Sequence, residues 1–259
     1  MPVKTMLGKS FLLFCVLLFV VSVSPSIAQS EEESETGFQL TYGADLVSQY
    51  VWRGSEIGEK MGIPHLQPGI NLDYLTRNSG TFTAYVWASY GISANYLETD
   101  FALSYEFETR YGTFGLGFTD YYYPYLRTWV LNFDKNGEGA HTIEGQFTYT
   151  FIESFPIQVL LASNLHNDLS GDNSLYIESS YPFDAGRFSF NLLAGAAKGE
   201  SIYYGIDKEK FQLISTGITI GTAINFSEKF ALPVGLDLIY NPFSEKGYVV
   251  FRVSYFLNL

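Results

Sequence analysis

The sequence predicts an all-β protein that forms a single antiparallel transmembrane β-barrel of about twelve strands, with short periplasmic turns and longer external loops. Three observations lead to this prediction. Apolar and polar residues alternate with a period of two from Phe38 to the last residue, as in strands that face two environments. Aromatic residues make up 17% of the chain and charged residues only 16%. After Ala28 no apolar run approaches the roughly 20 residues that a membrane helix needs.

The N-terminal segment predicts export. Residues 1–28 read as a secretory signal peptide, because Lys4 and Lys9 precede the apolar run FLLFCVLLFVVSV and the segment ends in SIA at Ala28. Residues 29–36, which carry four glutamates, are expected to form a flexible acidic tail. The barrel is then expected to span 37–259.

Composition narrows the classes of partner and cofactor. The formal net charge of −12 argues against nucleic acid as a partner. The single cysteine, Cys15, lies inside the predicted signal peptide, so the exported fold has to close by strand pairing and packing without disulfides. No cofactor is expected.

The first two predicted strands show the alternation most clearly. Between 38 and 52 the even positions are mainly apolar and the odd positions mainly polar, and between 65 and 74 apolar residues oppose His65, Gln67, Asn71 and Asp73. Each run therefore predicts a strand with one apolar and one polar face. Further runs follow at 80–92, 96–109, 112–124, 139–151, 156–166, 173–183, 187–197, 211–226, 230–240 and 248–259.

The connections between these runs predict the topology. Short segments, NSG, RYG, ESF, DAGR and SEK, alternate with longer ones that include SEIGEKMGI, YLRTWVLNFDKNGE, HNDLSGDN, KGESIYYGIDKEK and NPFSEKG; only the second loop, near SAN, is short. An outer-membrane barrel has this alternation of periplasmic turns and external loops. An even number of strands with both termini on the periplasmic side fits it.

Charge placement favours a membrane barrel over its alternative, a soluble exported β-protein with the apolar face inward. The candidate lipid faces carry no charge: Leu97, Phe101, Leu103, Tyr105 and Phe107 in one run, and Ile214, Ile218, Ile220 and Ile224 in another. Outer-membrane lipid is the expected surrounding. At the C-terminus, Tyr255, Leu257 and Leu259 share one face, as in the signal by which the barrel-assembly machinery recognises its substrates. The predicted location is the outer membrane of a Gram-negative bacterium.

Several segments of the predicted strands follow one another in a characteristic order: LVSQYVWRG, HLQPGINLDY, FTAYVWASYG, ETDFALSYEF, GLGFTDYYYP and SLYIESSYPF. They resemble a family of bacterial outer-membrane porins whose solutes are mostly undefined, and the best motif is SQYVWRG at 48–54. The resemblance spans nearly the whole exported chain and implies an exported β-barrel. Gln49 stands where relatives often have aspartate, so the resemblance assigns no role to a particular luminal residue.

The period of two also predicts which side chains line the barrel interior. The candidates are Asp45, Gln49, Arg53, Asp73, Glu98, Asp100, Glu106, Glu108, Glu144, Glu178, Asp237 and Arg252. Because carboxylates outnumber cations, this lining predicts passive diffusion of small hydrophilic solutes, cationic or neutral. The alternative is that these side chains pair across strands and fill a structural or adhesive barrel, whose external loops bind a partner.

Aromatic and histidine side chains are the remaining candidates for binding or catalysis. Trp87 and Tyr85 fall on the luminal face, where they either narrow the channel or pack on a loop. Most aromatic residues in DYYYPY, TWVLNF and SIYYG are expected in the outer interfacial girdle, with Trp129 or Tyr203 as the alternative platform for a planar solute. The histidines show no nucleophile-like or metal-binding pattern, so neither an enzyme nor a metal site is predicted.

Overall fold

The computed structural model describes the barrel and most of its connections. The described residues are 36–58, 61–77, 80–93, 96–124, 129–135, 138–168, 174–198, 204, 210–227 and 230–259. The predicted signal peptide and nearly all of the predicted acidic tail lie outside these ranges, as does Tyr203. In the described ranges, no helix has both the length and the apolar character to cross a bilayer.

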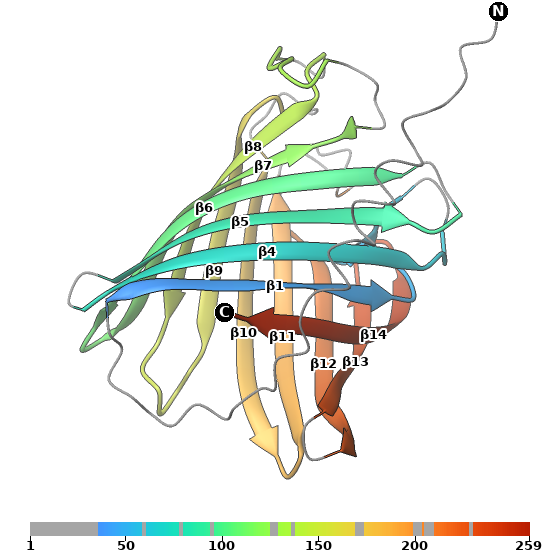
Figure 1. Cartoon of the computed structure of the whole chain (residues 1–259). Coiled ribbons are helices and arrows are strands. Elements are labelled where there is room, and N and C mark those ends of the chain that lie inside the picture. Colours follow the sequence, from blue (N-terminus) through green and yellow to red (C-terminus); the bar gives the residue numbers. More distant parts are fainter. Residues whose placement is uncertain are drawn as a thin grey trace, which may run out of the picture.

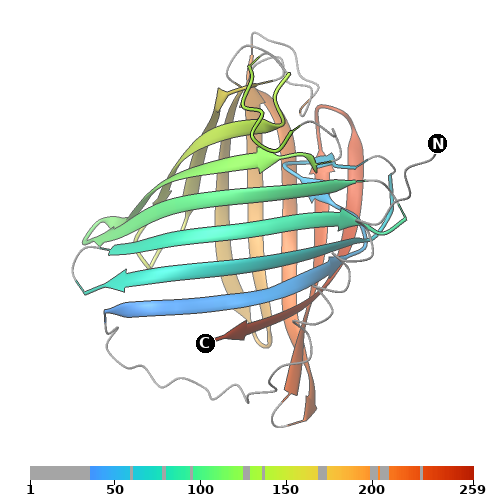
Figure 2. The same cartoon turned by 45° about the horizontal axis from the view of Figure 1, so that its top comes forward.

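Twelve strands form one closed antiparallel barrel, which confirms the predicted fold class and strand number (Figure 1). Its first and last strands pair with each other, with Asp45 opposite Ser254. Figure 2 shows the first four wall strands side by side across one face of the barrel. The wall strands are β1 (Gly37–Val47), β4 (His65–Thr76), β5 (Gly80–Gly91), β6 (Leu97–Thr109), β7 (Gly112–Tyr122), β8 (His141–Thr150), β9 (Gln158–His166), β10 (Leu175–Ala185), β11 (Phe188–Lys198), β12 (Gln212–Ser227), β13 (Phe230–Asn241) and β14 (Lys246–Asn258).

The two ends of the barrel differ in their connections. At the terminal end, where β1 begins and β14 ends, the strands are joined through 77–79, 110–111, 151–157, 186–187 and 228–229. At the loop end they are joined through 48–64, 92–96, 123–140, 167–174, 199–211 and 242–245. The predicted alternation of short turns and longer loops is therefore present, except that 151–157 is longer than the loop-end connections 92–96 and 242–245. The last connection, 242–245, is tighter than predicted, because β13 and β14 pair as far as Asn241 and Lys246.

The outer face of the wall is apolar over most of its height. Leu103 is 66% exposed and Phe118 is 58% exposed, and these two outward residues lie opposite each other on β6 and β7. Their neighbours along β6, Ala102 and Ser104, point inward and are less exposed. Large apolar side chains that face outward in this way match an apolar surrounding.

One prediction about this face is wrong. Ile214 was expected outward with Ile218, but it is completely buried in the barrel interior against Tyr176 and Tyr204. The cause is a bulge: the register between β11 and β12 shifts after Gly195. An extra residue in one strand reverses the inward and outward positions beyond it, and a strict period of two does not reveal that reversal.

Candidate functional site

Residues 50–56, hereafter the inserted hairpin, leave the wall and enter the loop half of the lumen. Its two short strands, β2 (Val51–Trp52) and β3 (Ser55–Glu56), pair only with each other. The part of this segment up to Arg53 was predicted to belong to the first wall strand and SEIGEKMGI to the loop that follows, but β1 ends at Val47. The prediction that Arg53 belongs to a wall strand is therefore wrong.

The tip of the inserted hairpin consists of Arg53 and Gly54, with φ angles of 47° and 75°. Two consecutive residues with positive φ form the tight turn favoured in two-residue hairpins. A Cβ on Gly54 would lie 1.9 Å from the carbonyl oxygen of Ile214, so only glycine fits. The Asn241 side-chain amide donates a hydrogen bond to the Gly54 carbonyl oxygen at 3.0 Å. These contacts hold the tip against the inner wall.

The Arg53 guanidinium is bound by side chains of the wall and of the 199–211 connection. Its Nη1 and Nη2 donate to the two carboxylate oxygens of Glu144 at 2.6 and 2.9 Å. Nη1 also donates to the Tyr204 hydroxyl at 2.8 Å. The guanidinium carbon lies 4.3 Å from the Tyr176 ring centroid and 4.4 Å from that of Trp52. The group thus combines a bidentate ion pair with two cation–π contacts.

Further hydrogen bonds orient Glu144, which is only 1% exposed. Its Oε1 accepts from the Tyr121 hydroxyl at 3.0 Å and from the Gln146 amide at 2.7 Å. These additional bonds offset part of the free energy that burial of two charges costs. Burial lowers the pKa of Arg53, but Tyr204 and Glu144 raise it, and the net direction is well above the ordinary value. The guanidinium therefore keeps its charge.

Aromatic rings fill the space around the inserted hairpin. Trp52 stacks on Tyr204 with ring centroids 5.7 Å apart. At the start of the hairpin, Tyr50 packs edge-on against Trp87 at 5.5 Å and near Tyr96 at 6.5 Å. Of the two readings of Trp87, packing on a loop is the one observed. The loop half of the lumen is therefore filled by side chains.

Two further acidic side chains lie in the same half. Glu98 and Asp100 are inward neighbours on β6 and are 3% and 8% exposed. Glu98 accepts a hydrogen bond from the Tyr96 hydroxyl at 2.5 Å, whereas Asp100 Oδ1 is buried without a hydrogen-bond partner. Among the described side chains, no ion pair joins either carboxylate to a cation. This half therefore holds two buried carboxyl groups in addition to Glu144, which is the carboxylate that Arg53 neutralises.

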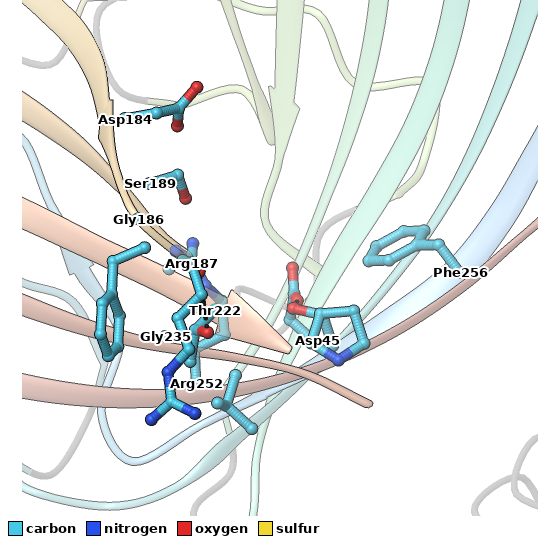
Figure 3. A pocket seen from close by; sticks show the side chains of 14 residues that line it. Asp45, Asp184, Gly186, Arg187, Ser189, Thr222, Gly235, Arg252 and Phe256 are labelled. Atoms are coloured by element: carbon cyan, nitrogen blue, oxygen red, sulfur yellow. Dashed lines mark hydrogen bonds between the residues drawn. The ribbon is translucent and has the colours of Figure 1, made fainter. Parts of the chain in front are cut away.

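The terminal half of the lumen is open. It contains a cavity of about 490 Å³ with charges of both signs. Figure 3 shows Arg187 and Arg252 toward one side of the cavity and Asp45 toward the other. Arg252 Nη2 lies 3.6 Å from Asp237 Oδ1, and Asp45 accepts a hydrogen bond from the Ser254 hydroxyl.

The remaining predicted pore-lining residues are distributed between these regions. Glu106 and Glu108 are exposed near the terminal end of β6. Asp73 accepts hydrogen bonds from Asn71 and Thr83, and Glu178 accepts one from the Tyr176 hydroxyl. Gln49 lies beyond β1, where its amide donates to the Val249 carbonyl oxygen at 2.9 Å. The structure therefore divides the predicted acidic lining into a buried and a water-exposed set.

Sequence analysis did not identify Tyr176 and Tyr204, which complete the Arg53 site. Their contribution depends on strand register and on the path of a connection. A local signal was present for the hairpin itself, since Arg-Gly after QYVW can form a two-residue turn with positive φ at both positions. If Arg-Gly had been interpreted as a turn, the first wall strand would have been predicted to end earlier in the sequence.

The histidines lie outside the Arg53 site. His141 Nδ1 lies 2.9 Å from Asp120 Oδ2 and its Nε2 lies 2.6 Å from the Val130 carbonyl oxygen, so this ring fastens the 123–140 connection. His65 Nδ1 lies 2.9 Å from the Ser89 hydroxyl, but both residues are buried. Within the described ranges, no three His, Cys, Asp or Glu side chains gather as a metal site.

The chain is similar in sequence to a family of bacterial proteins and in backbone structure to solved membrane proteins. A family model described as a bacterial protein of unknown function (Gcw_chp) matches residues 31–232. No curated protein matches the chain. One similar solved structure comes from work on the in-meso crystallization of membrane proteins, with 11% identity, 84% of each chain covered and a TM-score of 0.49. Another is an outer membrane channel from Pseudomonas putida F1, with 15% identity, 92% of this chain and 100% of the other covered, and a TM-score of 0.45.

Proposed function

Because the chain belongs to the bacterial Gcw_chp family, whose function is unknown, we propose a function from the geometry: an outer-membrane channel for small hydrophilic solutes, closed in its loop half by the inserted hairpin. The observation that carries this proposal is a polar, partly open lumen inside a closed wall with an apolar outer face. In this orientation the terminal end faces the periplasm and the loop end faces outward.

Charge in the terminal half supports a preference for cationic or neutral solutes. Glu106 and Glu108 are exposed inward neighbours near the terminal end, and no ion pair joins them to a cation in the described part of the chain. Arg252, by contrast, lies beside Asp237. In a narrow bore, unpaired carboxylates attract cations and repel anions.

Insertion into the outer membrane is proposed to use the C-terminal strand. Tyr255 and Leu257 pair with Ala44 and Tyr42 on the outward face at the barrel closure, and the Leu259 backbone exchanges hydrogen bonds with Leu40. The barrel-assembly machinery would recognise these residues before the barrel closes. Deletion of the last three residues, LNL, should lower the outer-membrane level sharply; unchanged insertion would remove this argument.

A second function is favoured by the buried Arg53–Glu144 pair. If the inserted hairpin never leaves the lumen, the barrel stays closed, and the protein is a structural or adhesive barrel whose external loops bind a partner. Planar-bilayer recordings separate the two functions. We expect resolved, cation-preferring openings from the purified protein, whereas complete absence of conductance at every voltage would favour the closed structural barrel.

A further inference from the structure

The pocket that holds Arg53 is complete without the arginine backbone. Glu144 comes from β8, Tyr176 from β10, and Tyr121, which orients Glu144, from β7. The inserted hairpin contributes only the guanidinium and the Trp52 ring. The Glu144 carboxylate in this arrangement needs a planar cation as its partner. That cation does not have to be part of the protein chain.

The backbone conformation of Arg53 is unfavourable for arginine, which indicates that this position is occupied by arginine because of its side chain. Its φ of 47° lies in the left-handed region, which residues with a Cβ adopt uncommonly. Asparagine or glycine would be the ordinary residue at this place in such a turn. A backbone outlier held by its surroundings is a reason to look for function, and here the surroundings are the guanidinium contacts.

From these contacts we propose that the Arg53 pocket is the channel's recognition site for the guanidinium group of a solute, which Arg53 occupies as a tethered ligand in the closed state. The inference rests on the proposed channel function and names its solute class. A solute with a guanidinium group would compete with Arg53 for Glu144, and the displaced hairpin would open the loop half.

The chemistry of the pocket selects guanidinium over other cations. The two oxygens of Glu144 each accept from a different guanidinium nitrogen, a fork that an ammonium group does not reproduce. The Tyr176 face adds a cation–π contact at 4.3 Å that a neutral isostere lacks.

The test is chemical rescue of an emptied pocket. Arg53→Ala, made in the full-length exported protein and purified in detergent, removes the tethered ligand; N-ethylguanidinium at millimolar concentration is the probe, and isothermal titration calorimetry measures its binding. N-ethylurea, which is similar in shape but neutral, is the control probe. Arg110→Ala is the matched control variant, because Arg110 also contacts a tyrosine ring but lies exposed at a turn.

We expect Arg53→Ala to bind N-ethylguanidinium at least about tenfold more tightly than the wild type or Arg110→Ala does, and to bind N-ethylurea no more tightly than they do. Adding Glu144→Gln to Arg53→Ala should weaken the binding at least about tenfold. Arg53→Gly, which also empties the pocket and adopts a positive φ readily, serves if the alanine variant does not fold, as judged by heat-modifiable gel migration.

A folded Arg53 variant that shows no gain in guanidinium binding, or that binds the urea equally well, would overturn the inference. Binding that persists undiminished when Glu144 is replaced would do the same. The titration involves no membrane, so its failure is distinct from failure of the channel: a conducting wild type with a pocket that rejects guanidinium would leave the channel proposal intact.

Discussion

Glu144 and Glu106 both point into the lumen, but they lie in different surroundings. Glu144, in the loop half, is 1% exposed and pairs with Arg53, whereas Glu106, in the terminal half, is exposed and has no ion-pair partner among the described residues. The first carboxylate binds the inserted hairpin through Arg53, and we propose that the second attracts cations that enter the lumen. In this proposal the same residue type closes one half of the lumen and sets the electrostatic potential of the other.

The largest expected effect comes from breaking the buried pair on one side only. Glu144→Gln leaves the Arg53 guanidinium buried without its carboxylate, which should lower the free energy of unfolding by about 3–5 kcal/mol. Denaturant unfolding of the variant and the wild type in lipid vesicles measures this loss of free energy. Adding Arg53→Ala to this variant should recover part of the loss, because no unpaired charge then remains. Strictly additive losses would show that the two side chains do not act as a pair.

A smaller effect is expected at the tip of the hairpin. Gly54→Ala places a Cβ 1.9 Å from the Ile214 carbonyl oxygen, so it should cost about 1–3 kcal/mol of stability from overpacking beyond the strain of a positive φ. Gly62→Ala is the matched control, because Gly62 also has a positive φ but a Cβ there would contact nothing. Equal stabilities for the two variants would mean that the tip can withdraw freely from the wall.

The smallest effect is expected from the exposed carboxylates. Glu106→Gln together with Glu108→Gln should move the zero-current potential in a salt gradient toward that of an unselective pore. The two carboxylates lie roughly 6.8 Å apart along one strand face, within the Debye length of about 8 Å at physiological salt, so the shift should be largest at low salt. Asp134→Asn, in the exposed loop-end connection, is the control. An unchanged potential would show that these residues lie away from the ion path.

The contrast between the halves also shows what could be read from the sequence. Alternation and turn chemistry are local, so the antiparallel barrel of twelve strands was predicted and is confirmed. The bacterial barrel family was predicted from the resemblance of segments such as SQYVWRG, and it is confirmed as well. The inward carboxylates of the terminal half followed from the same period. Ile214 and Arg53 were misplaced, because a bulge and an inserted hairpin depend on contacts with distant strands.

We propose that the Arg53–Glu144 pair keeps the loop half of the lumen closed. Single-channel recording in planar bilayers tests it most directly, comparing the wild type with the double variant Arg53→Ala/Glu144→Gln, which removes both charges and leaves neither unpaired. Heat-modifiable migration first establishes that the double variant is a folded barrel. We expect larger or longer openings from the double variant than from the wild type. A folded double variant with the same conductance and the same open times as the wild type would contradict the claim.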